Sequence, residues 1–153
     1  MKRSMGVFIL WGMLAAVING CSGSKPDRSA MRTDGLDGCP DRPNCVSSEA
    51  RDAAHGIAPL HLKGDPAAGW EVVLSVVSGL PRTITVKATD RYLHAECKSR
   101  IFGFIDDLEL QLNIATGVIS IRSASRVGYS DLGVNRRRVE ALREILKENG
   151  VIQ

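Results

Sequence analysis

The chain has 153 residues, of which 24% are charged and 44% hydrophobic, and its formal net charge is +3 at pH 7. This length has room for one modest domain with a single core. Two of the 20 basic residues stand at positions 2 and 3, and without them the charge is +1 (18 basic minus 17 acidic residues). A composition so close to neutral argues against a strongly basic, nucleic-acid-binding surface.

The first 20 residues predict a secretory leader. Lys2 and Arg3 give it a basic start, and residues 5–18 (MGVFILWGMLAAVI) form an apolar run with the length of a signal-peptide core, short for a membrane span. The run ends in INGC, which resembles the lipobox of bacterial lipoproteins. This resemblance implies cleavage before Cys21 and acylation of that residue. An ordinary cleaved signal peptide and an uncleaved anchor are the alternatives.

Acyl chains on Cys21 would hold the protein on a membrane. Ser22 follows, and the absence of Asp at this position favours an outer-membrane anchor facing the periplasm in a host with two membranes. Residues 21–38 are rich in Ser, Gly, Asp and Arg and have no apolar period, so we expect a flexible tether. Residues 39–153 then form a single domain.

The remaining three cysteines have different expected roles. Cys39 and Cys45 bracket CPDRPNC, whose prolines and Asn favour a turn, and in an oxidising compartment a disulfide is the simplest interpretation. The alternatives are two free thiols or half of a metal site with His55 and His61, whose spacing fits no zinc pattern. We therefore expect no metal and no cofactor. Cys97 has the apolar parity of its predicted strand, which indicates a core residue.

From residue 55 onward, hydrophobic periodicity predicts the order strand, helix, four strands, helix. The elements are an edge strand over 55–62, a helix over 65–80, strands over 83–89, around Cys97, over 106–114 and over 118–123, and a helix from Asn135, its N-cap, to Gly150. Short links between consecutive strands favour an antiparallel meander. Because one face is apolar and the other polar, both helices should cover the same face. The expected fold is α+β, a two-layer sandwich of about five mostly antiparallel strands with two helices on one face.

The last two strands carry opposite charges that should meet. A two-residue turn at positions 116–117 would pair apolar residues with apolar residues across the hairpin. The same register sets Asp107 opposite Arg126 and Glu109 diagonal to Arg122, all on the polar face. We therefore expect the carboxylates and the arginines to interact across this hairpin.

Residues 122–138 (RSASRVGYSDLGVNRRR) interrupt both periodicities with five arginines and two glycines. Three of these arginines lie in the predicted first helical turn, where cations oppose the helix dipole and need a negative partner. One interpretation is a structural ion-pair network; the other is a polar pocket for an anionic or polyhydroxylated ligand. The candidate ligand-binding residues are Asp107, Arg122, Ser123, Ser125, Arg126, Tyr129, Ser130, Asp131, Asn135 and Arg136.

Three function classes remain open. The first is a non-enzymatic envelope module that binds a ligand or an envelope protein through this polar segment. The second is a hydrolase or transferase that uses a Ser or Asp of the segment with His94 as base. Adjacent Asp106 and Asp107 would lie on opposite strand faces, a poor geometry for two-carboxylate chemistry. The third is a structural envelope component.

The segments CPDRPNCVSS, YLHAECKSRIFGFIDDLEL and IRSASRVGYSDLGVNRRRVEALR resemble those of the domain-of-unknown-function 1499 family, from about Cys39 to near the C-terminus. The resemblance implies an envelope or lumenal protein and no established activity. Cys97 and Gly103 depart from the pattern, where a bulkier or more basic residue is expected; this argues against a functional Cys97. The matching positions are Cys39, Cys45, Asp106, Asp107, Arg122, Ser123, Ser125, Arg126, Gly128, Ser130, Asp131, Gly133, Asn135 and Arg136.

Overall fold

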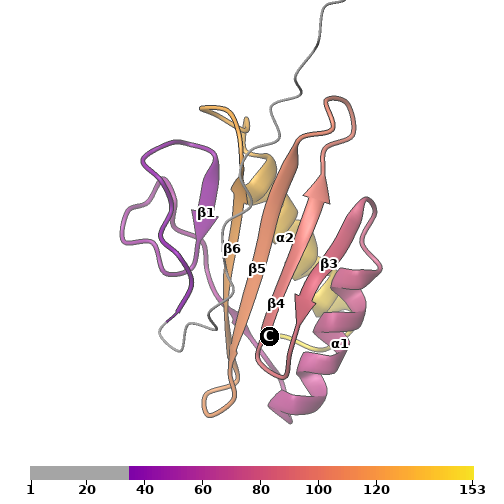
Figure 1. Cartoon of the computed structure of the whole chain (residues 1–153). Coiled ribbons are helices and arrows are strands. Elements are labelled where there is room, and N and C mark those ends of the chain that lie inside the picture. The colour runs from indigo at the N-terminus through magenta and orange to yellow at the C-terminus, as the bar shows by residue number, and fades with distance from the viewer. Residues whose placement is uncertain (1–34) are drawn as a thin grey trace, which may run out of the picture.

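The computed structural model describes residues 35–153 (Figure 1). The predicted leader over 1–20, the acylated Cys21 and most of the tether over 21–38 lie outside these residues. The first described residues contact the domain: the amide of Leu36 donates to Glu49 Oε2 at 3.0 Å. Over the described part of the chain, no helix has the length and hydropathy needed to cross a membrane.

The described residues form one six-stranded sheet in which every strand pairing is antiparallel. Its order is β1-β6-β5-β4-β3, and the short β2 pairs with β6 beside β1. The strands are β1 (Cys45–Ser47), β2 (Leu60–His61), β3 (Thr83–Ala88), β4 (Tyr92–Lys98), β5 (Ile105–Asn113) and β6 (Val118–Ser125). The long β4, β5 and β6 are therefore central, and the shorter strands form the two edges.

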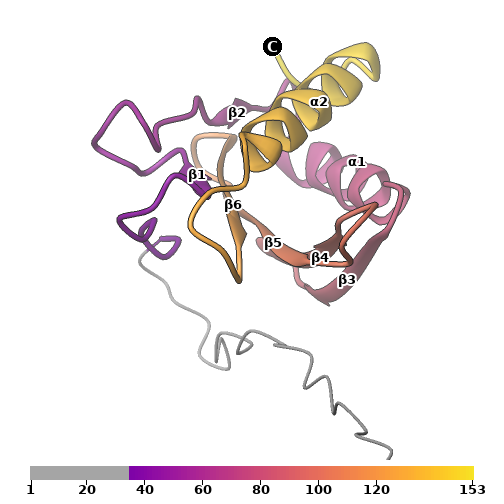
Figure 2. The same ribbon diagram turned by 90° about the horizontal axis from the view of Figure 1, so that it is seen from above.

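Two helices, α1 (Pro66–Ser78) and α2 (Val134–Glu148), cover one face of this sheet (Figure 2). Asp65 caps α1 by accepting from the amide of Ala67, and Pro66 occupies the first helical position, as its sequence predicts. The core lies between the helices and β4, β5 and β6. Buried Trp70 donates from Nε1 to the Thr89 carbonyl at 2.9 Å, which ties α1 to the end of β3. The predicted two-layer α+β sandwich is confirmed.

The outer edge of β6 differs most from the predicted elements. β1 is an additional strand, in a segment whose prolines and cysteines indicate a turn. The strand predicted over 55–62 shrinks to Leu60–His61, directly after Pro59, which has no amide hydrogen to donate. Both short strands gain their ladder from the long β6, a tertiary partner that local periodicity does not reveal.

The predicted register of the β5–β6 hairpin is wrong by two residues. Asn113 pairs with Val118, so residues 114–117 form the turn and Gly117 adopts a φ of 65° there. Because the shift is even, each side chain keeps its predicted face. Glu109 consequently lies directly opposite Arg122.

We predict a large difference between two apolar residues of the sheet. Leu110→Ala should lower the free energy of unfolding by about 2–5 kcal/mol, because fully buried Leu110 in central β5 would leave a cavity. Ile84, on edge strand β3, is 69% exposed, and Ile84→Ala is the matched control, with an expected change below about 0.5 kcal/mol. Urea denaturation measures both, and equal effects would contradict the placement of the core.

Candidate functional site

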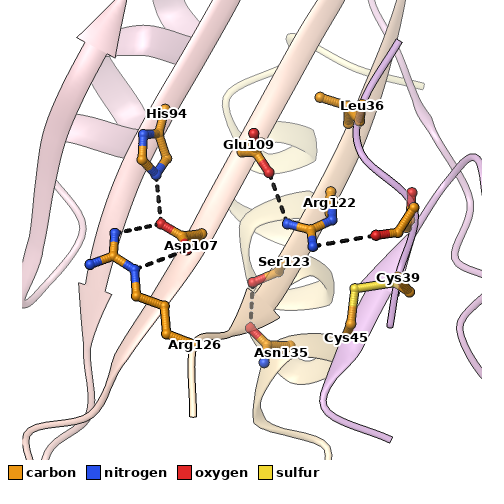
Figure 3. Close-up of polar contacts among 12 residues, drawn as sticks. Leu36, Cys39, Cys45, His94, Asp107, Glu109, Arg122, Ser123, Arg126 and Asn135 are labelled. Carbon is orange, nitrogen blue, oxygen red and sulfur yellow. Dashed lines mark hydrogen bonds and ion pairs between the residues drawn. A yellow bond between two sulfur atoms is a disulfide. The ribbon is translucent and has the colours of Figure 1, made fainter. Parts of the chain in front are cut away.

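Strand alternation divides the predicted polar segment between the two faces of the sheet. Arg122 points to the face without helices, whereas Ser123 points toward α2 (Figure 3). The structure therefore does not bring the candidate arginines and serines into one site. We name two groups. The open-face cluster is Tyr92, His94, Glu96, Asp107, Glu109, Arg122 and Arg126; the helix-face cluster is Asn44, Asp106, Ser123, Ser125, Asp131, Asn135 and Arg138.

Asp107 on β5 is the centre of one half of the open-face cluster. Arg126 donates to both of its carboxylate oxygens, from Nε at 3.0 Å and from Nη2 at 2.7 Å (Figure 3). His94 Nε2, on neighbouring β4, lies 2.6 Å from Asp107 Oδ1. The same Arg126 Nη2 also donates to Glu96 Oε1 at 2.8 Å. The predicted contact between Asp107 and Arg126 is thus present, although Arg126 reaches Asp107 along the strand and not from the opposite position.

Glu109 is the centre of the other half. Arg122 Nη1 donates to Glu109 Oε2 at 2.9 Å, and the Tyr92 hydroxyl donates to Oε1 at 2.7 Å. Arg122 Nη2 lies 3.5 Å from the Gly38 carbonyl, which brings the chain ahead of the disulfide over this face. The Nε of buried Arg122 finds no hydrogen-bond partner within residues 35–153.

Burial and hydrogen bonding have opposite effects on the pKa of Asp107 in the open-face cluster. Burial raises the pKa of Asp107, but the hydrogen bonds and charges of His94 and Arg126 outweigh it and hold that pKa well below its usual range. The hydrogen bond to Asp107 raises the pKa of Arg126, and burial lowers that of Arg122. Asp107 is therefore an anion at every physiological pH, and the arginine beside it is a fixed cation.

The helix-face cluster is organised around Asn135, which is fully buried. Its Nδ2 donates to the Asn44 carbonyl at 3.1 Å and to Ser125 Oγ at 3.0 Å, while its Oδ1 accepts from Ser123 Oγ at 2.6 Å. One side chain thus connects the start of α2, the end of β6 and the chain before β1. These contacts use all the polar atoms of the amide within the fold.

The prediction that Asn135 caps α2 is wrong. The N-cap is Gly133, in the left-handed region at a φ of 78°. The helix begins at Val134, so Asn135 is its second residue. Asp131 supplies the missing acceptor: its carboxylate accepts from the amides of Gly133 at 2.8 Å and Asn135 at 2.7 Å. A carboxylate at this helix start also compensates the dipole that the arginines oppose.

The three arginines at the start of α2 find their partners inside the protein. Arg138 Nη2 donates to Asp106 Oδ2 at 2.6 Å on β5. Arg136 donates to the carbonyls of Gly56 and Ala54 at 2.8 and 2.9 Å, and Arg137 donates to that of Leu132 at 2.9 Å. These contacts are those of a structural network. Sequence reasoning left Arg138 out of the site. The opposite strand parities of Asp106 and Asp107 place Asp106 on the helix face, where an arginine of α2 is its natural partner, and this signal could have identified Arg138.

The remaining candidates lie in the exposed loop between β6 and α2. Tyr129 and Ser130 are both exposed and belong to neither cluster. Ser130, Asp131 and Arg136 line a small pocket of about 210 Å³ beside Cys45. Sequence reasoning also missed Tyr92 and Glu96, although both share the polar parity of His94 on β4.

The cysteines within residues 35–153 follow their predictions, whereas Cys21 lies outside the described residues. Cys39 and Cys45 form the expected disulfide, which joins the segment before β1 to that strand (Figure 3). Cys97 is a buried free thiol on the core face, and burial raises its pKa. A thiol with a raised pKa carries little thiolate and is a poor nucleophile.

The sheet separates His94 from the two serines of β6. Ser123 and Ser125 lie on the helix face, whereas His94 lies on the open face, so His94 cannot activate either hydroxyl. Asp106 and Asp107 likewise point to opposite faces, as their parity predicts. Over residues 35–153, no three His, Cys, Asp or Glu side chains are grouped as metal ligands would be.

We predict that Asp107→Asn lowers the free energy of unfolding by about 1.5–3 kcal/mol at pH 7, because Arg126 loses its charged partner on β5 and keeps only Glu96. The folded-state pKa of Asp107 is depressed, so its contribution is complete above the unfolded value of 3.8 and is lost as the pH falls below it. The difference between wild type and variant should stay constant from pH 7 to about 5 and shrink below about 4. Urea denaturation across this range measures it; a difference independent of pH would refute the assignment.

Asn135→Ala should lower the free energy of unfolding by about 1–3 kcal/mol, because it removes the buried acceptor of the Ser123 hydroxyl and the hydrogen bonds to the Asn44 carbonyl and Ser125 Oγ. Arg137→Ala is the matched control in the same helical turn. Its side chain is exposed, and a change below about 0.5 kcal/mol is expected. Thermal unfolding of both variants tests whether the helix-face cluster holds α2 in place.

Comparison with known proteins agrees with these motifs. The model of the family described as "Protein of unknown function (DUF1499)" matches residues 35–146. This match spans both polar clusters, the disulfide and all six strands. A search of the curated proteins and a search of the solved structures each found no match. The chain belongs to the DUF1499 family.

Proposed function

We propose that the protein is a lipid-anchored, non-enzymatic binding module of the cell envelope, and that the open-face cluster binds a polyhydroxylated ligand. The helices of the described chain cover the opposite face, and the side chains of this cluster are largely buried, so a ligand would approach at the segment around Gly38 that contacts Arg122 and not at a helix (Figure 2). The side chains are held by ion pairs, and a site whose groups are already fixed loses little entropy on binding.

The observation that carries the proposal is the Nε of Arg122. A buried donor without an acceptor costs about 1–3 kcal/mol, and a well-placed ligand oxygen would remove that cost. The rest of this guanidinium is oriented by Glu109 and by the Gly38 carbonyl, so the direction of the Nε–H is set by the fold. The neighbouring carboxylates can accept hydrogen bonds from ligand hydroxyl groups.

The charges of the cluster favour a neutral ligand over an anion. Its three carboxylates and two guanidinium groups alone sum to a formal charge of −1. Each guanidinium group already has a carboxylate partner, so a second anion would meet repulsion from the carboxylates. Hydroxyl groups both donate and accept, which suits an array of alternating carboxylate and guanidinium groups.

The envelope location rests on the sequence. The apolar run over residues 5–18, the INGC motif and Cys21 support export and acylation. The Cys39–Cys45 bond adds support, because disulfides persist in oxidising compartments. A binding module tethered by acyl chains would present its open face to ligands of the periplasm.

Native mass spectrometry of the full chain, extracted from cells in mild detergent and mixed with neutral and anionic oligosaccharides, tests both parts. We expect a chain that begins at Cys21 with added acyl mass, and adducts with the neutral sugars. Arg122→Lys keeps the positive charge but loses Nε, and should weaken these adducts at least tenfold, about 1.4 kcal/mol.

Arg91→Lys changes an exposed arginine outside the cluster and is the control for this substitution. Thermal unfolding shows whether each variant retains its fold. Equal adducts for Arg122→Lys and wild type, or a preference for anionic sugars, would refute the assigned ligand class. An N-terminus without acyl mass would refute the anchor and leave the binding site to be judged separately.

A further inference from the structure

The loop between β4 and β5, residues 99–104, exposes three large apolar side chains in succession. Ile101, Phe102 and Phe104 are 81%, 75% and 51% exposed. Scattered apolar residues on a surface need no explanation, but a contiguous group at the tip of a protruding hairpin indicates an interaction site. The loop extends beyond the end of the sheet (Figure 1).

This tip is held in shape by its own contacts. The Ser99 amide donates to the Phe104 carbonyl at 2.8 Å, and the Phe104 amide donates back to Ser99 Oγ at 2.9 Å. Gly103 adopts a φ of 67°, which lets the chain turn between the two aromatic residues. The rings of Phe102 and Phe104 stack with their centroids 5.6 Å apart. The apolar surface is therefore preformed.

The charged residues of the tip itself are all positive, and Glu96, two residues before Lys98, is paired with Arg126. Lys98 and Arg100 flank it, and residues 98–105 contain no carboxylate. Asp106, the first acidic residue after the loop, is buried and paired with Arg138 on the opposite side. Arg82 lies next to this loop, because its carbonyl accepts from the Lys98 amide at 2.9 Å. Cations beside exposed apolar groups are complementary to anionic lipid headgroups over hydrocarbon.

A second loop lies at the same end of the sheet (Figures 1 and 2). The Arg126 amide donates to the Ile105 carbonyl at 3.3 Å, which places the start of the β6–α2 loop beside the start of β5. This loop exposes Tyr129 at 72% and Leu132 at 84%. Apolar side chains therefore emerge at two places on one end of the molecule.

We propose that this end of the domain docks on an anionic lipid surface, with Ile101, Phe102 and Phe104 inserted among the headgroups. A protruding apolar tip with a cationic border suits a deformable, negatively charged lipid layer. Lys98 and Arg100 are long enough to keep their charges at the phosphates while the tip inserts. This inference does not depend on the ligand of the open-face cluster.

The test uses the full chain reconstituted in vesicles, with a protease site inserted after Ala30. Cleavage removes the N-terminal anchor, and sedimentation then measures the fraction of the domain that stays on the vesicles. Vesicles with about one third phosphatidylglycerol are compared with phosphatidylcholine vesicles. Wild type should remain on the anionic vesicles roughly tenfold more than on the neutral ones.

The double variant Phe102→Ser, Phe104→Ser should lose about tenfold of this retention, and Lys98→Gln, Arg100→Gln should remove its dependence on anionic lipid. The matched control is Ile84→Ser, Val86→Ser, which replaces apolar residues that are also exposed but lie on edge strand β3. Thermal unfolding verifies the fold of each variant. Equal loss in the control, or no retention of wild type on any vesicle, would overturn the proposal and point to a protein partner for this end.

Discussion

Two adjacent carboxylates of β5, Asp106 and Asp107, each bind an arginine on opposite faces of the sheet. Asp107 receives Arg126 from the end of β6, and Asp106 receives Arg138 from the first turns of α2. Strand alternation makes this possible, because neighbouring side chains point to opposite faces. The path of the chain from β6 into α2 is thereby held from both sides, and the position of the second helix layer depends on it.

Buried ion pairs of this kind contribute specificity more than stability. Removing charges from water is costly, and their mutual attraction does little more than offset that cost when every partner is present. Loss of one partner, however, leaves a buried charge without compensation. A loop rich in Gly, Ser and Arg has no apolar pattern to fix its course, so the ion pairs and Asn135 select one arrangement where hydrophobic packing cannot.

The same molecule therefore separates three kinds of surface. The helix face is used for packing, the open face carries fixed charges, and the loop end carries preformed apolar side chains with cations around them. These regions share few residues, so ligand binding on the open face and contact with lipid at the loop end could operate together. An anchored domain held at a second point would also have a restricted orientation, which would present the open face in a defined direction.

Much of the fold was predictable from local pattern. The apolar stripe and Asp65–Pro66 predicted α1, period-two alternation predicted β5 and β6, and the parity of Cys97 predicted its burial. The close pair Cys39–Cys45 was predictable from its spacing and prolines. These features depend on residues near one another in the chain, where helix capping, strand alternation and loop closure act.

Tertiary structure decided the features that depend on residues far apart in the chain, such as the short strand β1 and the role of Asn135. β1 exists because β6 offers an edge, and Asn135 is a buried connector because Asp131 takes over the cap. Alternation also separated Arg122 from Ser123, so residues adjacent in sequence serve different faces. The sequence by itself determined which residues are polar and which face each occupies. Only the packing of helices on one face decided which polar groups support the helix layer and which lie on the opposite face of the sheet.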